Sequence, residues 1–263
     1  MTKTKAYQTK TTPLPKLALI TRDNAHGYFL ASALHKQIPN LNLIVEKPVL
    51  GTVKKIKFQL KRLFKSNPSS ALLYLFELPL LAYLEHLSQK KITSILKVNT
   101  FPDIPTYRVP HINSKECWKM LEKLKLDSSI VYGSSVIGKT SLKKLGKVLN
   151  CHMGIVPQYR GAKAEFWALY QNDDTNLGYS IHECIEKLDA GDLIYQAKIH
   201  SQDGPSIQRA LALQHLGEHA PKIWLDYCFG KHSNIEQRGE VKYYSTPRLS
   251  ERFRLWVNRG YII

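Results

Sequence analysis

The stretch that decides the fold of this chain is VLNCHMGIVPQYRG, residues 148–161. Its lead-in, Leu145 to Leu149, has the apolar character of a short buried strand. Side chains alternate between the two faces of a strand, so Asn150 and His152 project together while Cys151 points to the opposite face. The sequence therefore presents an amide and an imidazole side by side at the end of a strand.

A carboxylate to accompany them lies farther along the chain, at Asp189 in the turn LDAGD, residues 188–192. An amide, an imidazole and a carboxylate that converge suit the attack of an amine on an acyl carbon. The imidazole handles the proton, the carboxylate fixes its tautomer, and the amide donates a hydrogen bond to the developing oxyanion. For an isolated Asn-x-His motif, the simpler interpretation is a strand-end Asn and a core His whose hydrogen bonds are satisfied.

Further motifs follow in order: FWAL (166–169), GYSIH (178–182), LDAGD (188–192) and Gln196. Together with residues 148–161 they resemble the folate-dependent formyltransferase family, which includes the methionyl-tRNA, glycinamide ribonucleotide and sugar-nucleotide N-formyltransferases. The resemblance is strong from Ile130 to Gln196 and weak outside that range. One departure is Met153-Gly154, where the family usually has Pro-Ser or Tyr-Ser.

The resemblance implies that Asn150, His152 and Asp189 are a catalytic triad, with either His152 or Asp189 as the base. It implies 10-formyltetrahydrofolate as the formyl donor and an unprotonated primary amine as the acceptor. Two strand-exit loops would hold the donor largely through backbone groups: Gly133, Ser134, Ser135, Val136 and Ile137 in one, and Leu188, Ala190, Gly191 and Asp192 in the other.

Five more residues near the triad are candidates for contact with the acceptor: Met153, Gly154, Tyr159, Arg160 and His182. Arg160 suits a phosphate or carboxylate, but a surface salt bridge is its default role. His182 shares a strand face with Cys184, so it either lines the same crevice or has a structural role.

The rest of the chain predicts an α/β fold, an open and mostly parallel twisted sheet with helices on both faces. The expected elements are the strand Leu17–Ile20, the helix Tyr28–Ile38, the strand Leu43–Val45, the helix Lys115–Leu124 and the strand Ser129–Tyr132. No G-x-G-x-x-G motif is present, so a dinucleotide site is not predicted. In such sheets ligands gather outside the carboxyl ends of the strands, where the triad is expected.

Residues 15–228 are expected to form the catalytic domain, preceded by a flexible basic tail (1–14) and followed by a basic C-terminal extension (229–263). Residues 52–88 are predicted to be an inserted helical hairpin. Its first helix has an apolar stripe among many Lys and Arg, and Asn67-Pro68 breaks it. A second helix, capped at Ser69 or Ser70 and ending near Ser88, is apolar nearly all round. Glu77 and Pro79 at its centre argue against a membrane span.

The net charge of +17 is concentrated at the ends of the chain. Residues 1–66 contribute +11 and residues 229–263 contribute +4, which leaves +2 for the motif-bearing part between them. Such a field favours nucleic acid, anionic lipid or a polyanionic substrate as a partner, but it does not identify a reaction. The basic hairpin is therefore either a solvated face packed on the domain or a peripheral contact with an anionic membrane or polyanion.

The four cysteines have no CxxC spacing and the N-terminus has no signal-peptide pattern, so free thiols and a cytoplasmic location are expected, with the inner face of the membrane as an alternative. No metal is expected. A metal hydrolase built from His152, His182 and Asp189 is an alternative that lacks a supporting motif such as H-E-x-x-H. Formyltetrahydrofolate hydrolase is another, but the residues before Leu17 leave little room for its usual regulatory domain.

The acceptor is expected to be a small molecule, and a nucleotide-linked amino sugar is the first choice. Methionyl-tRNA and glycinamide ribonucleotide are the alternatives. The tRNA enzyme usually adds a C-terminal barrel, for which the residues after Asp189 leave little room, so nucleic acid is the less favoured partner. An oligomer is left open.

Overall fold

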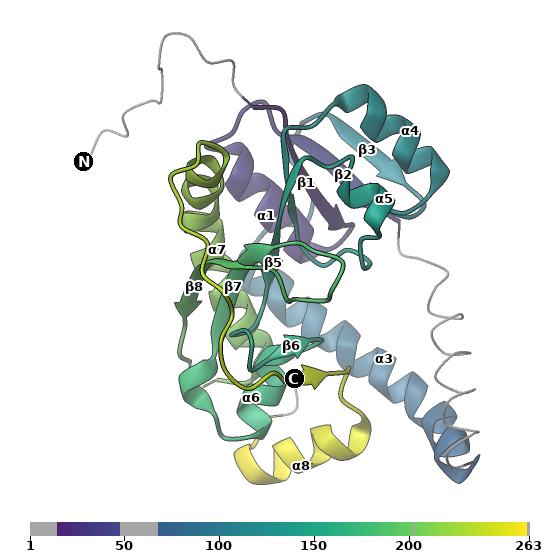
Figure 1. The fold of residues 1–263 in the computed structure, drawn as a ribbon. Helices are drawn as coiled ribbons and strands as arrows, with labels where there is room; N and C mark the ends of the chain where they lie inside the picture. Colours follow the sequence, from purple (N-terminus) through teal and green to yellow (C-terminus); the bar gives the residue numbers. More distant parts are fainter. Residues whose placement is uncertain (1–14, 48–67, 202, 262–263) are drawn as a thin grey trace.

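The computed structural model describes residues 15–47, 68–201 and 203–261, and the side chains of residues 68–72 are outside the description (Figure 1). A seven-stranded sheet forms the centre, in the order β3-β2-β1-β4-β5-β7-β8. The strands are β1 (Leu17–Arg22), β2 (Asn42–Glu46), β3 (Thr106–Val109), β4 (Ser128–Val131), β5 (Lys147–His152), β7 (Gly178–Glu183) and β8 (Leu193–Lys198). The first five strands of that order are parallel, and β7 and β8 are antiparallel to their neighbours. The expected mostly parallel α/β sheet is confirmed.

Helices cover both faces of the sheet (Figure 1). One face carries α1 (Ala25–His35), α3 (Pro68–Leu96) and α7 (Pro205–Cys228), and the other carries α4 (Lys115–Leu124) and α5 (Lys139–Leu142). Strand β1 shows how the sequence divides the two cores. Leu17 and Leu19 join the cluster under α1 and α7, whereas Ala18 and Ile20 join the cluster under α4. This alternation of fully apolar side chains is typical of a central parallel strand that is buried on both faces.

The helix boundaries follow local capping signals. Ser114 accepts a hydrogen bond from Cys117 N and begins α4 at the predicted residue. Helix α1 begins three residues before the predicted start at Tyr28, because Asn24 Oδ1 accepts from Gly27 N at 3.0 Å and caps the helix there.

Helix α3 is longer than predicted, and its expected end near Ser88 is wrong. Ser88 Oγ lies 2.7 Å from Ser206 Oγ of α7, and Ile92 and Leu96 continue the same helical face into the core. These contacts explain the two extra turns. The first half of the predicted hairpin, residues 52–67, lies outside the described residues. In the part of the chain that the structure describes, no helix has the length and apolar composition needed to cross a membrane.

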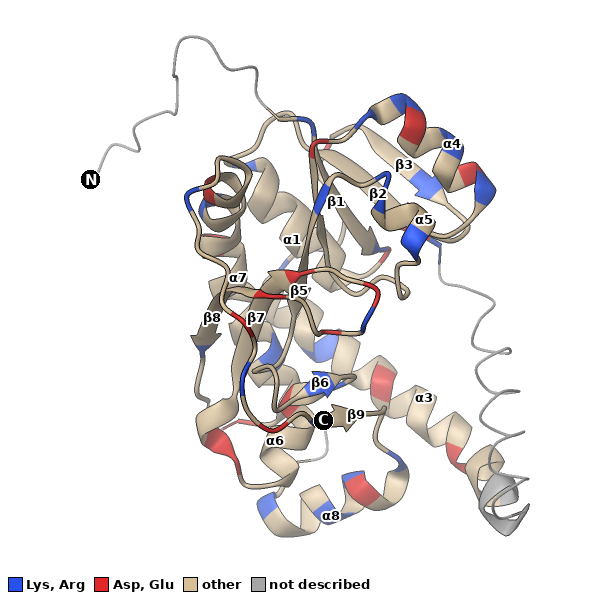
Figure 2. Ribbon diagram, viewed as in Figure 1, with Lys and Arg blue, Asp and Glu red and all other residues tan. Residues whose placement is uncertain are grey.

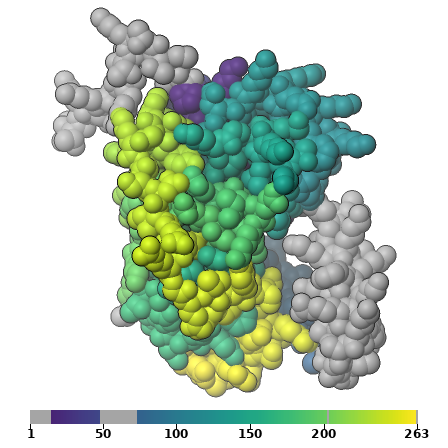
Figure 3. Space-filling model, viewed as in Figure 1, coloured from purple at the N-terminus to yellow at the C-terminus, as the bar shows by residue number. Residues whose placement is uncertain are grey.

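A smaller layer lies beside the sheet. Strand β6 (Arg160–Gly161) pairs in parallel with β9 (Tyr243–Tyr244), and α6 (Ala164–Tyr170), the 3-10 helix η1 (Asp174–Asn176) and α8 (Leu249–Arg259) complete it. Figure 3 shows that the C-terminal residues run across one face of the molecule. Figure 2 shows basic and acidic residues interspersed along α4 and α8. The boundary between the catalytic domain and the C-terminal extension, expected at residues 228/229, remains a prediction.

Candidate active site

A cavity of about 540 Å³ lies outside the carboxyl ends of β4 and β5. The loop after β4 forms one wall, the end of β5 forms the floor, and residues 184–189 form the opposite rim. Asn150, His152 and Asp189 all line it, as the parallel-sheet argument predicts. The three predicted catalytic side chains are therefore brought together in one cavity.

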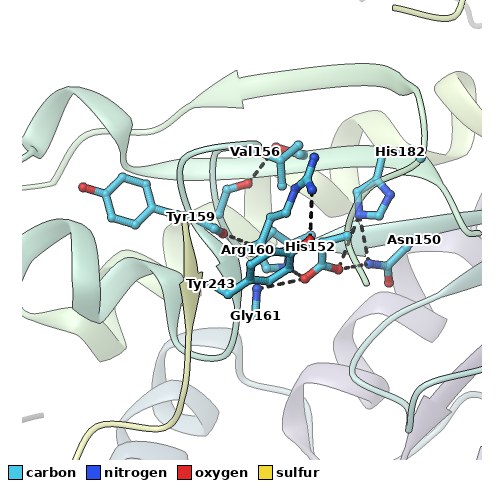
Figure 4. Close-up of polar contacts among 12 residues, drawn as sticks. Asn150, His152, Val156, Tyr159, Arg160, Gly161, His182 and Tyr243 are labelled. Carbon is cyan, nitrogen blue, oxygen red and sulfur yellow. Dashed lines mark hydrogen bonds and ion pairs between the residues drawn. The ribbon is translucent and has the colours of Figure 1, made fainter. Parts of the chain in front are cut away.

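Asn150 connects the other polar groups (Figure 4). Its Nδ2 donates to Asp189 Oδ1 at 3.1 Å and lies 3.1 Å from His182 Nε2, which accepts the second hydrogen. His182 Nδ1 in turn lies 2.8 Å from Glu183 O, so a proton on Nδ1 satisfies both ends of that ring. His182 thus lines the cavity and also orients Asn150, which combines the two roles that the sequence left open.

His152 is buried, and its two ring nitrogens have different surroundings. Nε2 lies 2.6 Å from Tyr159 O, so Nε2 carries a proton and donates it to that carbonyl. Nδ1 lies 3.6 Å from Asp189 Oδ2, too far for a direct hydrogen bond. Burial lowers the pKa of His152 below its ordinary value, although Asp189 opposes that shift. In the neutral ring, Nδ1 therefore has a free lone pair beside a carboxylate.

Asp189 is ionised at neutral pH. Burial alone raises the pKa of a carboxyl, but His152, His182 and the N–H of Gly161 outweigh it and bring the pKa of Asp189 to about 2. Gly161 N donates to Asp189 Oδ2 at 2.9 Å. Asp189 also has φ of 47°, a left-handed conformation that is uncommon for a residue with a side chain. Such a backbone persists only when its surroundings hold it.

Three residues from distant parts of the chain supply that support, and we call Arg160, Gln237 and Tyr243 the backbone clamp. Figure 4 labels Arg160 and Tyr243. Gln237 Nε2 donates to Asp189 O at 3.1 Å and to Gly191 O at 2.7 Å. Its Oε1 accepts from Arg160 Nε at 3.2 Å and from Nη2 at 2.6 Å. Arg160 Nη1 donates to the Tyr243 hydroxyl at 3.1 Å. Arg160 is only 4% exposed, so its interpretation as a surface salt bridge is wrong.

The predicted donor loops divide into two groups. Gly133 to Ile137 and Leu188 line the cavity, whereas Ala190, Gly191 and Asp192 do not. Gly133 has φ of 67° and no atom within 4 Å of the position a Cβ would take, so its backbone faces open space. The buried carboxylate of Glu46 holds this loop, because Oε2 accepts from Ser135 N at 2.8 Å. Glu46 was not among the residues predicted from sequence.

The predicted acceptor residues are also divided. Met153 and His182 line the cavity, but Gly154, Tyr159 and Arg160 do not. Gly154 packs behind the catalytic ring, where an added Cβ would lie 2.8 Å from His152 Nε2 and 2.4 Å from Ala164 Cβ. Tyr159 contributes its carbonyl to His152, and its hydroxyl donates to Asp173 at 2.7 Å. Both residues position His152 from behind the cavity.

Several cavity residues were missed from the sequence. They come from β1, the start of α6, α7 and the C-terminal segment: Arg22, Lys163, Arg209, Tyr244 and Thr246. Only Lys163 lies close in sequence to a predicted site residue, and no short pattern marks the others. As for metals, no group of three or more His, Cys, Asp or Glu side chains among the described residues is arranged to hold an ion.

Comparison with known proteins gives a consistent picture. Residues 86–214 match the family model described as formyl transferase. A methionyl-tRNA formyltransferase of Streptococcus agalactiae is 25% identical over 118 residues, which is 44% of this chain and 38% of the relative. That of Finegoldia magna is 35% identical over 91 residues, 34% of this chain and 29% of the relative. The chain thus spans less than half the length of these curated relatives.

Solved structures of the same fold cover most of the chain. A 4-N formyltransferase from Francisella tularensis has a TM-score of 0.55 at 15% identity, covering 88% of this chain and 76% of its own. A sugar N-formyltransferase from a Shewanella species has a TM-score of 0.54 at 12% identity, covering 91% and 86%. Glycinamide ribonucleotide transformylase 1 from Symbiobacterium toebii has a TM-score of 0.55 at 12% identity, covering 89% and 100%. At these identities the likeness concerns the fold.

Proposed function

This chain belongs to the formyltransferase family, and on that premise we propose that it moves a formyl group from 10-formyltetrahydrofolate to the primary amine of a small acceptor. One observation carries the proposal: Asn150, His152 and Asp189 converge on a single cavity at the carboxyl ends of the parallel strands. An acyl transfer to an amine needs a proton acceptor, a charge to stabilise that acceptor, and a donor for the oxyanion.

His152 serves as the base in this mechanism. The amine nitrogen attacks the formyl carbon, and His152 Nδ1 takes a proton from that nitrogen while Nε2 keeps its hydrogen bond to Tyr159 O. Asp189, ionised 3.6 Å away, stabilises the imidazolium that results. Asn150 donates one N–H to the oxyanion in place of its contact with His182. The bond from the formyl carbon to the folate nitrogen then breaks, and the imidazolium returns its proton to that nitrogen.

The donor fits the cavity wall formed by Gly133 to Ile137 and Leu188. The backbone at Gly133 is open to the cavity, and Glu46 fixes the loop from behind. Among the solved relatives, a HypX protein from Aquifex aeolicus was crystallised in complex with tetrahydrofolic acid, which supports a folate as the donor.

A nucleotide-linked amino sugar is the acceptor that we propose first. It is supported by sugar N-formyltransferases among the structural relatives, one of them crystallised in the presence of dTDP and 5-N-formyl-THF. Methionyl-tRNA is the second candidate, because the sequence relatives are methionyl-tRNA formyltransferases. A peripheral contact of residues 52–88 with anionic membrane remains a prediction, which sedimentation with anionic vesicles would test.

The test is a formylation assay with 10-formyltetrahydrofolate and a panel of dTDP-linked amino sugars, glycinamide ribonucleotide and Met-tRNA, read by mass spectrometry. We expect a gain of 28 Da on an amino sugar, with tetrahydrofolate released in equal amount. Formate released without any formylated amine would favour a formyltetrahydrofolate hydrolase. Turnover that disappears with a chelator and returns with zinc would favour the metal hydrolase.

A further inference from the structure

The N-terminal half of α3 exposes apolar side chains on two of its faces. One stripe has the periodicity of a helix face and consists of Leu73, Phe76, Leu80 and Tyr83. The next face consists of Leu75, Pro79 and Ala82. All of these residues are exposed, and 75% of the Phe76 surface is accessible. Figure 1 shows that this half of α3 extends beyond the sheet. A contiguous exposed apolar area of this kind marks an interaction site.

Helix α8 adds exposed apolar residues beside α3. Its N-cap residue, Arg248, donates to the two carboxylate oxygens of Glu77 in α3 at 3.1 and 2.9 Å, so the start of α8 lies against α3. Leu255 of α8 packs in the core, whereas another side of the helix presents Phe253, Trp256 and Val257 to solvent. We call these three residues, together with the exposed residues of α3 named above, the apolar surface.

The charge next to the apolar surface is positive. Between Leu73 and Leu84 the only charged residue is Glu77, and its buried side chain is paired with Arg248. Residues 51–67, which directly precede α3 in the sequence, contain six Lys and Arg and no Asp or Glu. Exposed apolar and aromatic side chains beside a run of cations are typical of an element that lies on an anionic membrane.

Two other occupants agree less well with these features. A second copy of the chain would bring together two molecules of net charge +17, each with its run of cations beside the contact. A neighbouring segment of the same chain would cover one face of α3, whereas two faces are apolar. A lipid surface meets both conditions, because fluid acyl chains surround apolar side chains of any arrangement and anionic headgroups attract the cations.

We propose that the apolar surface docks on an anionic lipid bilayer, with the exposed side chains of α3 and α8 inserted at the boundary between headgroups and acyl chains. The proposal goes beyond formyl transfer and beyond the contact predicted for residues 52–88, because it adds the insertion of apolar side chains and a second helix, α8. The apolar surface also adjoins the cavity. Lys163, which lines the cavity, lies 2.8 and 3.0 Å from the carboxylate oxygens of Glu85 in α3, and the lining residue Thr246 precedes α8. Docking therefore holds the cavity close to the membrane.

The binding test is sedimentation with vesicles, made either from equal parts of phosphatidylglycerol and phosphatidylcholine or from phosphatidylcholine alone. The proteins compared are the wild type, Phe76→Gln/Leu80→Gln on α3, Phe253→Gln/Val257→Gln on α8, and the control Phe229→Gln. Phe229 is an exposed aromatic residue too, but it follows α7 at the opposite end of that helix from Ser206, which contacts α3. Circular dichroism checks that each variant is folded.

We expect the wild type and Phe229→Gln to bind the anionic vesicles, and each double variant to bind them at least about tenfold more weakly, because every methylene removed from the acyl region weakens binding. Added salt and pure phosphatidylcholine should each weaken the binding of the wild type, since the attraction of the cations is screened or lost. If the wild type does not bind anionic vesicles, or if either double variant binds them as the wild type does, the proposal is wrong.

Sedimentation velocity without lipid tests the second copy as the occupant. We expect the wild type and both double variants to have the same sedimentation coefficient at every protein concentration. A dimer of the wild type that both double variants dissociate would assign the apolar surface to a second copy and overturn the proposal.

The fluorescence of Trp256 measures insertion directly. Phosphatidylglycerol with brominated acyl chains quenches a Trp that lies among those chains, so we expect quenching in the wild type that is lost in Trp256→Phe, a variant that stays apolar and still binds. Bound vesicles that leave the fluorescence of Trp256 unchanged would show a contact through charge alone and would contradict insertion.

Turnover separates this proposal from the proposed function. Formyl transfer to a soluble acceptor without lipid should stay within a few-fold of wild type in both double variants. A folded double variant that loses turnover would place α3 or α8 in the active site and overturn the assignment. Vesicle binding by a wild type that transfers no formyl group would overturn the proposed function and leave the apolar surface standing. Formyl transfer without vesicle binding would do the reverse.

Discussion

His152 depends on neighbours that hold both sides of its ring. The carbonyl of Tyr159 fixes Nε2, Asp189 faces Nδ1, and the lack of a side chain at Gly154 leaves room for the ring itself. These contacts decide which nitrogen carries the proton, and therefore which one is free to act as a base. The chemistry of this residue is set by backbone atoms as much as by the carboxylate.

Gln237 is the positioning residue that we expect to matter most among those outside the triad. Gln237→Ala removes both hydrogen bonds to the backbone around Asp189, where φ is left-handed. We predict that kcat falls about tenfold or more while the KM of the donor changes less, because each lost bond is worth about 1 kcal/mol. Steady-state kinetics measures this. Glu236→Ala, next to it and exposed, is the control. A wild-type kcat in Gln237→Ala would exclude a role for the clamp.

The sequence predicts the triad but not its supports. Asn150 and His152 follow from strand alternation, and Asp189 from a turn whose spacing matches a family pattern. Gln237 lies 48 positions after Asp189, and Arg209 lies on a helix with no motif. Their roles depend on how the chain returns to the site, which local periodicity does not encode.

The short pairing of β6 with β9 ties the catalytic loop to the C-terminal segment. Arg160 and Gly161 pair with Tyr243 and Tyr244, and Trp167 stacks on Tyr244 at 5.2 Å between ring centroids. Because Gly161 also donates to Asp189, this ladder joins the catalytic carboxylate to the far end of the chain.

Gly161→Ala tests the ladder. Gly161 has φ of 98°, and an added Cβ would lie 2.3 Å from Tyr244 O, so the two strands must separate. We predict a loss of kcat of about 100-fold together with a lower unfolding midpoint. Gly230→Ala is the matched control, because Gly230 has φ of 68° but no atom within 4 Å of its added Cβ. If both variants lose the same activity, backbone strain alone explains the effect and the ladder is not required.

Element ends were predictable where a cap lies beside them, as at Ser114, and unpredictable where tertiary contacts extend a helix. Helix α3 continues past Ser88 because its face packs on α7 and α1. The apolar pattern of one segment does not show which other helices will pack against it, so it does not predict that such packing lengthens the helix.

At the scale of the whole molecule, a buried histidine makes folding sensitive to acid. His26, 4% exposed at the start of α1, is neutral in the folded protein because burial lowers its pKa to about 3. An unfolded chain takes up this proton below its ordinary pKa of about 6.5, so unfolding is favoured as the pH falls from 6.5 toward 3.

We predict that His26→Phe flattens this dependence. Between pH 6.5 and pH 5 the wild type should lose about 2 kcal/mol more of its free energy of unfolding than the variant does, at about 1.4 kcal/mol per pH unit for one proton. Urea denaturation at both pH values measures the difference. The exposed His200→Phe should behave as the wild type does. Parallel curves for His26→Phe and the wild type would show that His26 is protonated in the folded state.

The overall fold could be predicted from the sequence because a parallel sheet has a clear sequence pattern. Apolar strands such as Leu17–Ile20 alternate along the chain with amphipathic helices such as Lys115–Leu124. The path of residues 229–261 could not be predicted from the sequence. Polar residues there contact the site through side chains and backbone, and they follow no periodic pattern.

The central claim is that the cavity transfers a formyl group to an amine with His152 as the base. The most direct measurement follows a ¹³C-labelled formyl group from 10-formyltetrahydrofolate in the wild type and in Asn150→Ala, His152→Ala and Asp189→Ala, each checked for folding. We predict that the label enters an amide of the acceptor in the wild type, and that each variant slows this by about 10²-fold or more. A His152→Ala protein that keeps more than about a tenth of wild-type turnover would contradict the account.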